Sequence, residues 1–490
     1  MSHPFRRVSA TQLTLPHALD CPITLFATPD VPLQRAAAQE LTTFLDRLTH
    51  LPTLHGRTPP ARLHRVALTP DFHKGAGIPV GTVLHTEGVL FPEAIGNDVA
   101  CGMGLHTTTL TRDDLEPHLD ALEDTLRRVF FQGQRRLSTT GKQREAVLRS
   151  GIGALVDTPL HPGQSGLWSR VRDSLPADAR QRLHAGGQLP VLSVPAHLDW
   201  LREPHHLTHD AQLGSVGGGN HFVEIQYVHR LLDRDTAHHW HLKAGQVVVM
   251  VHSGSLGFGH LAAQQARTAA QAALPEEPVW AALPVRDGGP AHQPVMDALN
   301  AAANFAAVNR LCLAGMAAQA LSEHLPGTST SLLYDAPHNF IWPDPAGGWL
   351  HRKGATPARG FAGMQGTPFA FTGEPVIVPG SMGGSSFLLA GRGLPEALSS
   401  ASHGAGRLRS RGEAMRGHDD EFHAFLRDFR VVTPLDWRRA RPDIQAQKLR
   451  ELKQEAPFAY KGIGPVIRTL AESGIAAPVA ELRPLITVKG

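Results

Sequence analysis

The sequence predicts an α/β fold: one large domain with mixed β-sheets, helices outside them and a central cleft. Two observations lead to this prediction. Segments with the apolar spacing of helices alternate along the chain with short, Val- and Ile-rich segments that are typical of strands. The composition agrees, because a hydrophobic fraction of 42% and a charged fraction of 19% are ordinary for a globular protein, and 490 residues can bury a large core.

Each element follows from the local pattern of the sequence. Helical spacing of apolar residues predicts helices at residues 33–50, 113–131, 260–274 and 295–324. Short β-rich runs predict strands at residues 83–91, 222–228, 246–251 and 375–380. Residues 133–210 are richer in Gly, Pro, His and Arg, which predicts an irregular or helical insertion.

The charge balance and the cysteines limit the class of protein. With 47 Lys and Arg against 44 Asp and Glu, the net charge is only +3, which excludes a histone-like basic protein but allows local basic surface. Three cysteines do not make a disulfide framework in so long a chain. The first residues lack the apolar core of a signal peptide, and no apolar run approaches the ~18 residues of a membrane span. We therefore expect a cytoplasmic protein without a membrane partner.

Glycine and histidine coincide in several loops, which makes these loops the candidates for a site. They are DFHKGAG (71–77), IGNDVACGMG (95–104), GSVGGGNHFVEI (214–225), VHSGSLGFGH (251–260), DAPHNF (335–340) and SASHGAGR (400–407), together with the Gly/Ser loop PGSMGGSS (379–386). Glycine allows sharp turns and close approach to a ligand, and successive backbone N–H groups can hold phosphate. Loops that follow apolar strands often carry function.

Five residues in these loops form a candidate metal site. Asp98 and Cys101 lie three apart in a glycine-flanked turn, although a free cysteine is often only a small buried apolar residue. His221, His252 and His338 each lie at the end of an expected strand, and each alone is as well explained by a structural role. Together the five residues predict a mixed N, O and S site for a borderline transition metal, with manganese, zinc, iron and cobalt all compatible.

His403 differs from these histidines in its surroundings. Gly404 and Gly406 leave its ring accessible, and Arg407 can bind a phosphate. A histidine can act as a covalent nucleophile toward a nucleotide, while a general base or a further metal ligand remains an alternative. The chain has no Walker A sequence, so a nucleotide would bind through another architecture.

One known family has these motifs in the same order. The sequence resembles the RtcB family of GTP- and manganese-dependent RNA ligases in D-x-H-K-G, I-G-x-D-x-x-C-G-M, G-G-G-N-H-F-x-E-I, H-S-G-S-x-G, H-N, H-R-K-G-A-T, P-G-S-M-G, S-H-G-A-G-R and a final V-K-G. The resemblance implies an RtcB-like catalytic domain over residues 61–490, with a metal and nucleotide cleft at its centre. Residues 1–60 form an N-terminal segment without a match.

The resemblance also implies roles for individual residues. Asp98, Cys101 and His221 match the ligands of one manganese ion, and Cys101, His252 and His338 match those of a second, so the thiolate would bridge them. His403 matches the histidine that takes up GMP. Residues expected to hold GTP are Asn220, Glu224, Asn339, Pro379, Gly380, Ser381, Met382, Ser385, Gly404, Ala405, Gly406, Tyr460 and Lys489. Weaker candidates for RNA contacts are Asp71, Lys74, Arg352, Lys353 and Arg407.

The implied function is the joining of RNA ends. GMP would pass from His403 to an RNA 3′-phosphate, which also arises from a 2′,3′-cyclic phosphate, and a 5′-hydroxyl end would then displace it. Two alternatives remain: a metal- and guanylate-binding protein that senses or protects RNA ends without joining them, and a metal-dependent phosphodiesterase for cyclic phosphate ends. We expect a monomer, and the resemblance leaves a protein activator open.

Four positions depart from the family pattern. Leu256 and Gly104 stand where the family usually has Arg, Asn97 stands where it usually has Tyr, and Pro357 stands where many members have Arg. The expected consequence is the loss of two or three contacts to RNA phosphate. This would make the protein a divergent paralogue that handles RNA ends differently, such as a repair enzyme for broken RNA.

Overall fold

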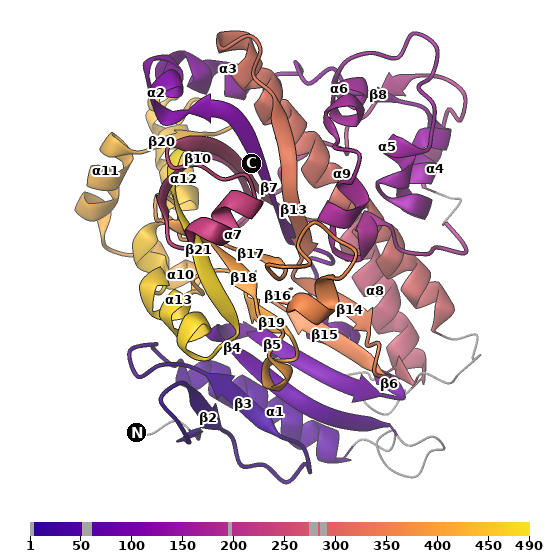
Figure 1. Ribbon diagram of the computed structural model, residues 1–490, viewed down its shortest axis with the longest axis vertical. Helices are drawn as coiled ribbons and strands as arrows, with labels where there is room; N and C mark the ends of the chain where they lie inside the picture. Colours follow the sequence, from indigo (N-terminus) through magenta and orange to yellow (C-terminus); the bar gives the residue numbers. More distant parts are fainter. Residues whose placement is uncertain (1–3, 51–60, 195–197, 274–282, 285–291) are drawn as a thin grey trace.

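A computed structural model describes residues 4–50, 61–194, 198–273, 283–284 and 292–490. Two large β-sheets form its centre, and the longer helices pack on their outer faces (Figure 1). This arrangement confirms the predicted α/β fold. No helix within the described ranges is long and apolar enough to cross a membrane.

The first sheet combines strands of the N-terminal segment with strands from the start of the predicted domain and from residues 339–353. Its seven strands follow the order β1 (Arg6–Arg7), β2 (Gln12–Thr14), β3 (Ile23–Phe26), β4 (Arg62–Ala76), β5 (Ile78–Glu87), β15 (Trp349–Lys353) and β14 (Asn339–Pro343). Helix α1 (Arg35–His50) packs on β4 and β5 at the bottom of Figure 1. The N-terminal strands β1 to β3 thus belong to the same sheet as β4, β5, β14 and β15.

The second sheet has eight strands and bears most of the site. Seven follow the order β13 (Thr330–Pro337), β7 (Gly102–Thr111), β11 (Gln246–Ser253), β10 (Phe222–Leu231), β21 (Ala476–Val488), β18 (Ser386–Gly391) and β17 (Pro375–Val378), and β20 (Arg430–Val432) pairs with β21 in parallel. Three short pairs complete the β-structure: β6 (Val89–Leu90) with β12 (Leu283–Pro284), β16 (Ala355–Pro357) with β19 (Ser400–Ser402), and β8 (Ser138–Thr139) with β9 (Thr208–His209).

One long helix, α9 (Gln293–His324), covers the second sheet. It is rich in alanine, the best helix former, and has a proline in its first turn, where the missing N–H has no cost. The other helices are α2 (Arg112–Leu115), α3 (Leu119–Phe131), α4 (Gly141–Ser150), α5 (Gly153–Val156), α6 (Leu167–Ser174), α7 (Arg234–His239), α8 (Leu256–Ala273), α10 (Arg411–Ala414), α11 (Asp419–Asp428), α12 (Pro442–Lys453) and α13 (Ile463–Glu472). The range 133–210 contains α4, α5 and α6 with irregular connections.

The predicted helices and strands are present, with shifted ends. Helix α8 begins four residues before the predicted residue 260, and the predicted strand 83–91 is divided into β5 and β6 at Gly88, whose φ is 68°. Several strands were not predicted, among them β7, β13 and the two longest, β4 and β21. Both contain prolines, which disfavour strands because they lack an N–H, and both have register shifts that accommodate them.

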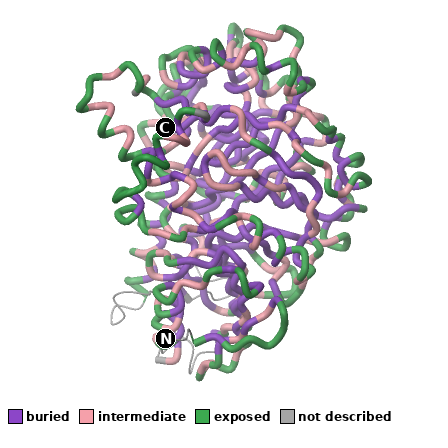
Figure 2. Tube along the Cα trace, turned by 90° about the vertical axis from the view of Figure 1, so that its left-hand side faces the viewer, coloured by how far each residue is buried: buried purple, intermediate pink, exposed green. Residues whose placement is uncertain are grey.

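The buried apolar side chains of the described residues form several clusters. Figure 2 shows buried residues concentrated in the interior of the molecule and exposed residues mainly at its periphery. The largest cluster of buried apolar side chains joins α9 to β7, β10 and β11. A second cluster lies between α1 and the first sheet. The packing in these two clusters holds the loops between the sheets in fixed positions.

Candidate active site

Four adjacent strands of the second sheet bring the predicted metal ligands together. The ligands are Cys101 before β7, His221 before β10, His252 near the end of β11 and His338 after β13. In the antiparallel register, Phe222 lies opposite His252, which lies opposite Met103. The four residues therefore occupy one end of neighbouring strands, although they are far apart in the sequence.

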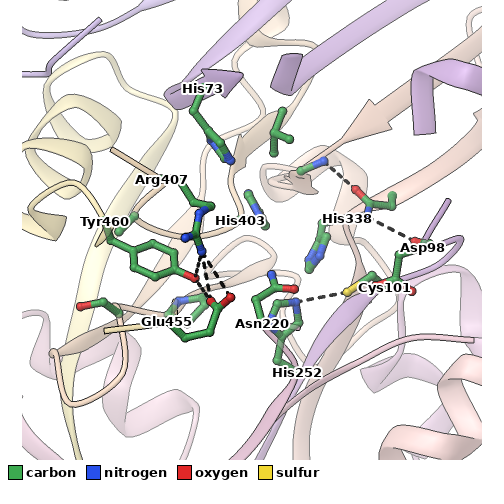
Figure 3. Close-up of a pocket in the computed structure, with 18 of the residues that line it drawn as sticks. His73, Asp98, Cys101, Asn220, His252, His338, His403, Arg407, Glu455 and Tyr460 are labelled. Atoms are coloured by element: carbon green, nitrogen blue, oxygen red, sulfur yellow. Dashed lines mark hydrogen bonds and ion pairs between the residues drawn. The ribbon is translucent and has the colours of Figure 1, made fainter. Parts of the chain in front are cut away.

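The donor atoms of Cys101, His221 and His252 lie within 4.8 Å of one another. The Cys101 Sγ is 3.2 Å from the Nε2 of His221 and 3.2 Å from the Nε2 of His252. The Asp98 Oδ2 is 2.7 Å from the His221 Nε2. The His338 ring lies beside the His252 ring, with a centroid distance of 5.1 Å. All five predicted ligands are thus in one cluster, part of which is visible in Figure 3.

The chemistry of this donor set fits a metal ion. Burial and the neighbouring histidines lower the pKa of His252 and His338 well below the usual range, so both rings are neutral and present lone pairs. The Nε2 of His221 faces the Cys101 sulfur and the Asp98 carboxylate, so it is the nitrogen that would bind a metal here. Sulfur, nitrogen and carboxylate donors together suit a borderline divalent cation.

A buried ion pair supports the cluster from the side of α9. Arg310 donates to both carboxylate oxygens of Asp335 at 2.6 Å. It also donates to the carbonyls of Ala100, at 3.0 Å, and Ser253, at 3.1 Å. These carbonyls belong to the residues next to Cys101 and His252, so the guanidinium fixes the backbone that carries two of the predicted ligands.

The predicted nucleophile is paired with a buried carboxylate. The Nδ1 of His403 lies 2.6 Å from the Oδ2 of Asp71, and the Thr69 hydroxyl donates to the other oxygen of Asp71 at 2.5 Å. Burial raises the pKa of Asp71, but the hydrogen bonds from His403 and Thr69 and the nearby charges of His403 and His73 together outweigh it, so the net pKa is lowered. With its Nδ1–H held by a carboxylate, His403 keeps the lone pair on Nε2. Its ring lies 4.8 Å from that of His338.

A cavity of about 450 Å³ joins His403 to the metal-ligand cluster. In Figure 3, His403 and Asn220 lie between Cys101 and His338 on one side and Arg407, Tyr460 and Glu455 on the other. Predicted residues that line the cavity are Asp98, Cys101, His252, His338, His403, Asn220, Glu224, Asn339, Pro379, Gly380, Ser381, Met382, Gly404, Ala405, Gly406, Tyr460, Lys489, Lys74, Lys353 and Arg407. His221 lies behind them, bonded to Asp98 and Cys101.

One wall of the cavity pairs an acid with a lysine. Glu224 on β10 accepts hydrogen bonds from Thr487 and Gln226, and burial raises its pKa to about 7. Burial lowers the pKa of Lys489 to about 8, and the Lys489 ammonium donates to the Gly219 carbonyl at 2.6 Å. This wall offers both acceptors and donors to a planar polar ligand.

The opposite wall is an aromatic and ionic cluster. The Arg407 guanidinium lies 4.9 Å from the centre of the Tyr460 ring and donates to both oxygens of Glu455 at 3.3 Å. The Tyr460 hydroxyl donates to Glu455 as well. The sequence analysis missed Glu455 and its second partner Arg411, because neither lies in a glycine-rich motif.

Three further predicted site residues do not line the cavity. Asp71 is fully buried against His403, which leaves it no surface for the predicted RNA contact. Arg352 is also buried, and its Nε donates to the Ser400 hydroxyl at 2.9 Å, which keeps it from RNA. Ser385 donates to Glu481 at 2.9 Å and lines a neighbouring surface hollow with Arg112 and Tyr227.

The departures from the family pattern have local explanations. A Cβ at Gly104 would lie 2.9 Å from the Oδ2 of Asp335, so position 104 is interior and marks no lost RNA contact. Pro357 is buried in β16. Leu256 packs against Gly217 at the start of α8. Asn97 lies at the cavity and accepts a hydrogen bond from Arg267 at 2.5 Å.

Comparisons with known proteins give a consistent result. The model of the family described as "tRNA-splicing ligase RtcB" matches residues 56–490. A tRNA-splicing ligase RtcB of Thermococcus kodakarensis is 34% identical to this chain, and the match covers 86% of each protein. The RNA-splicing ligase RtcB of Mycobacterium tuberculosis is 32% identical over 86% of this chain and 96% of its own. The tRNA-splicing ligase RtcB of Pyrobaculum aerophilum is 31% identical over 86% of this chain and 87% of its own.

Proposed function

The chain belongs to the RtcB family, and we propose that it joins RNA ends through a guanylate carried on His403. That it is an RNA ligase follows from the family and from the names of its relatives. The observation that supports the route through His403 is its 2.6 Å contact with Asp71, at the edge of a cavity that also contains the metal-ligand cluster.

The donor cluster would hold the metal. Its ligands would be Asp98, Cys101 and His221 for one manganese ion, and Cys101, His252 and His338 for a second. When bound, these ions would neutralise phosphate charge and orient the reacting phosphorus. The short contacts of the Cys101 sulfur with two imidazole nitrogens support Cys101 as one of the residues that would hold the metal.

The first step would form a bond between His403 and GMP. The lone pair on the His403 Nε2 attacks the α-phosphorus of GTP, the bond from this phosphorus to the bridging oxygen breaks, and pyrophosphate leaves. Asp71 holds the Nδ1 proton, so the ring attacks in a fixed orientation and its developing positive charge is stabilised. The backbone of Gly404, Ala405 and Gly406 follows directly and lies at the same cavity.

Glu224 would select the base. Its carboxylate lies at the cavity and can accept from the N–H groups of guanine, whereas adenine offers a bare ring nitrogen at the equivalent edge. Lys489 can donate on the same wall, and Tyr460 offers an aromatic face on the other. These contacts explain a preference for GTP.

The later steps would act on RNA. An oxygen of an RNA 3′-phosphate attacks the phosphorus of the His403–GMP bond, so the N–P bond breaks and the 3′ end carries GMP. A 5′-hydroxyl then attacks the 3′-phosphorus, a 3′,5′-phosphodiester forms and GMP leaves. A 2′,3′-cyclic phosphate must first be opened by water. Lys74, Lys353 and Arg407 at the cavity would bind RNA phosphates.

Labelled GTP tests the proposal. With manganese and GTP labelled at the α-phosphate, the protein should gain an acid-labile label. His403→Ala should abolish the label, and the exposed control His205→Ala should retain it. An RNA pair with 3′-phosphate and 5′-hydroxyl ends should then be joined. A wild-type protein without label would overturn the mechanism, and label without joined RNA would favour the sensor of RNA ends instead.

A further inference from the structure

The N-terminal segment reaches the candidate active site. Residues 6–50 form β1 to β3 and α1, and all of them precede residue 56, where the family match begins. Helix α1 packs on β4, the strand that carries Asp71. Contacts between this segment and the cavity would thus be a property of this chain that the family match does not describe.

The side chain of Gln34, just before α1, joins the end of β4 to the loop after β19. Its Nε2 donates to the carbonyl of Arg407 at 2.9 Å and to the carbonyl of Leu408 at 3.0 Å. Its Oε1 accepts from the backbone N–H of Lys74 at 2.9 Å. One turn further along α1, Glu40 accepts from the backbone N–H of Gly75 at 2.8 Å.

These two segments, the end of β4 and the loop after β19, carry the Asp71–His403 pair. Lys74 follows Asp71 by three residues, and Arg407 follows His403 by four. The segments also touch directly, since a Cβ at Gly406 would lie 2.4 Å from the Asp71 carbonyl oxygen. Lys461 joins them from the interior, because its backbone N–H donates to Gly406 at 2.9 Å and its ammonium donates to Phe72 at 2.7 Å. Gln34 links the same two segments on their outer side.

We propose that Gln34 is a positioning residue that holds the His403 loop against the Asp71 hairpin, and so makes the N-terminal segment part of the guanylate-transfer site. The inference rests on the proposed role of His403. A displacement of either segment lengthens the 2.6 Å contact between Asp71 and His403 and turns the attacking nitrogen away from the cavity.

Only a primary amide meets all three partners. The two carbonyls require a donor, and the Lys74 N–H requires an acceptor. Gln34→Met keeps the length of the side chain and loses all three hydrogen bonds. Gln34→Lys keeps donors for the carbonyls and loses the acceptor. Gln34→Glu keeps the acceptor and sets a carboxylate against two carbonyl oxygens, which repel it.

Single-turnover guanylylation with labelled GTP and manganese tests the positioning role. For Gln34→Met and Gln34→Glu, the rate constant at saturating GTP should fall about tenfold, which corresponds to about 1.4 kcal/mol in the barrier. The GTP concentration for half-maximal rate should change less than about twofold, because the residues that hold the nucleotide are untouched. The rate constant of Gln34→Lys should lie between those of these two variants and that of the wild type. The control is Gln39→Met, at an exposed position of the same helix, which should behave as wild type.

Hydrogen exchange separates this proposal from the one on which it rests. In Gln34→Met, amide exchange within residues 70–76 and 404–409 should become faster, whereas Gln39→Met should leave it unchanged. Wild-type guanylylation rates in Gln34→Met would overturn the positioning role. If the wild type takes up no GMP, the proposed function fails, and unchanged exchange in Gln34→Met then also rejects the tie between the two segments.

Discussion

Asp71 and His403 are 332 residues apart in the sequence, and their side chains are 2.6 Å apart in the structure. Asp71 accepts a hydrogen bond from His403 with one oxygen and from Thr69 with the other, so both carboxylate oxygens have partners inside the protein. The pair explains why a histidine in a glycine-rich loop can act as a nucleophile: the carboxylate fixes both its tautomer and its direction.

Replacement of Asp71 by Asn tests the orientation of the ring. The amide keeps the shape and can still bond Thr69, but it presents an N–H to His403 or favours the wrong tautomer. We expect the rate of guanylylation to fall by at least about a hundredfold, with little loss of GTP binding. Label incorporation and equilibrium binding of GTP measure the two quantities. Wild-type labelling by Asp71→Asn would contradict the orienting role.

Cys101 can be tested as a metal ligand without any substrate. Cobalt(II) bound to a thiolate gives a near-ultraviolet charge-transfer band, so the wild-type protein should show this band when it is titrated with cobalt. Cys101→Ser should lose the band and bind cobalt at least about tenfold more weakly. Cys21→Ser, at a half-buried position in the N-terminal segment, is the matched control and should keep the band. A band that survives in Cys101→Ser would remove the thiolate from the site.

Residues in motifs were predictable, and residues that act through long-range contacts were not. His221 and His252 lie near glycines and His338 lies between Pro337 and Asn339, each at the end of a strand, and the structure brings them together as expected. Asp71 lies in such a motif too, but its function depends on a partner that no local pattern identifies. Glu455 has no motif at all and is found only through its contacts with Arg407 and Tyr460.

At the scale of elements, α9 is more than a cover for the second sheet. It brings Arg310 beneath the donor cluster, where the guanidinium is buried and bonded to Asp335 and to two backbone carbonyls. A charge in such a place is stable only when its partner is present. The helix and the strand β13 are therefore coupled through one ion pair.

Arg310→Met should destabilise the metal-free protein by about 3–5 kcal/mol, because Asp335 is left as an uncompensated buried charge. The double variant Arg310→Met, Asp335→Leu should recover part of this loss, since both charges are then removed. Denaturant unfolding of the wild type, of the single variants Arg310→Met and Asp335→Leu and of the double variant measures the coupling as a double-mutant cycle. Equal stability of the wild type and Arg310→Met would show that the pair contributes nothing.

Elements with a regular apolar pattern were also easier to predict than strands whose pairing is irregular. Helix α9 and the strands β10 and β11 have uniform apolar spacing and lie close to their predicted positions. Strand β21 contains two prolines, and its pairing with β10 and β18 is irregular. A bulged strand between two partners depends on the surrounding sheet, which a local pattern does not contain.

At the scale of the whole molecule, buried neutral histidines make the fold sensitive to acid. Burial lowers the pKa of His106 to about 4 and that of His351 to about 3. In the unfolded chain both groups titrate near ~6.5. Between these values the unfolded state binds more protons than the folded state, so the free energy of unfolding falls as the pH falls from about 6.5 toward 4.

His106→Met should reduce this sensitivity, because methionine does not titrate. Between pH 7.5 and pH 5.0 the wild type should lose about 2 kcal/mol more than the variant, from the single proton that His106 takes up on unfolding. Denaturant unfolding of metal-free protein at the two pH values gives the difference. An identical loss in both proteins would show that His106 is not the group responsible.

Strand β21 has a consequence for how the protein is made. It lies between β10 and β18 in the second sheet and is followed directly by Lys489 at the cavity, yet it is the last strand of the chain. On a ribosome that adds about 5–20 residues per second, β10 waits roughly 12 to 50 seconds for this partner. The nascent chain holds an unpaired sheet edge at β10 during that time, so its yield in the cell should depend on chaperones and on the speed of translation.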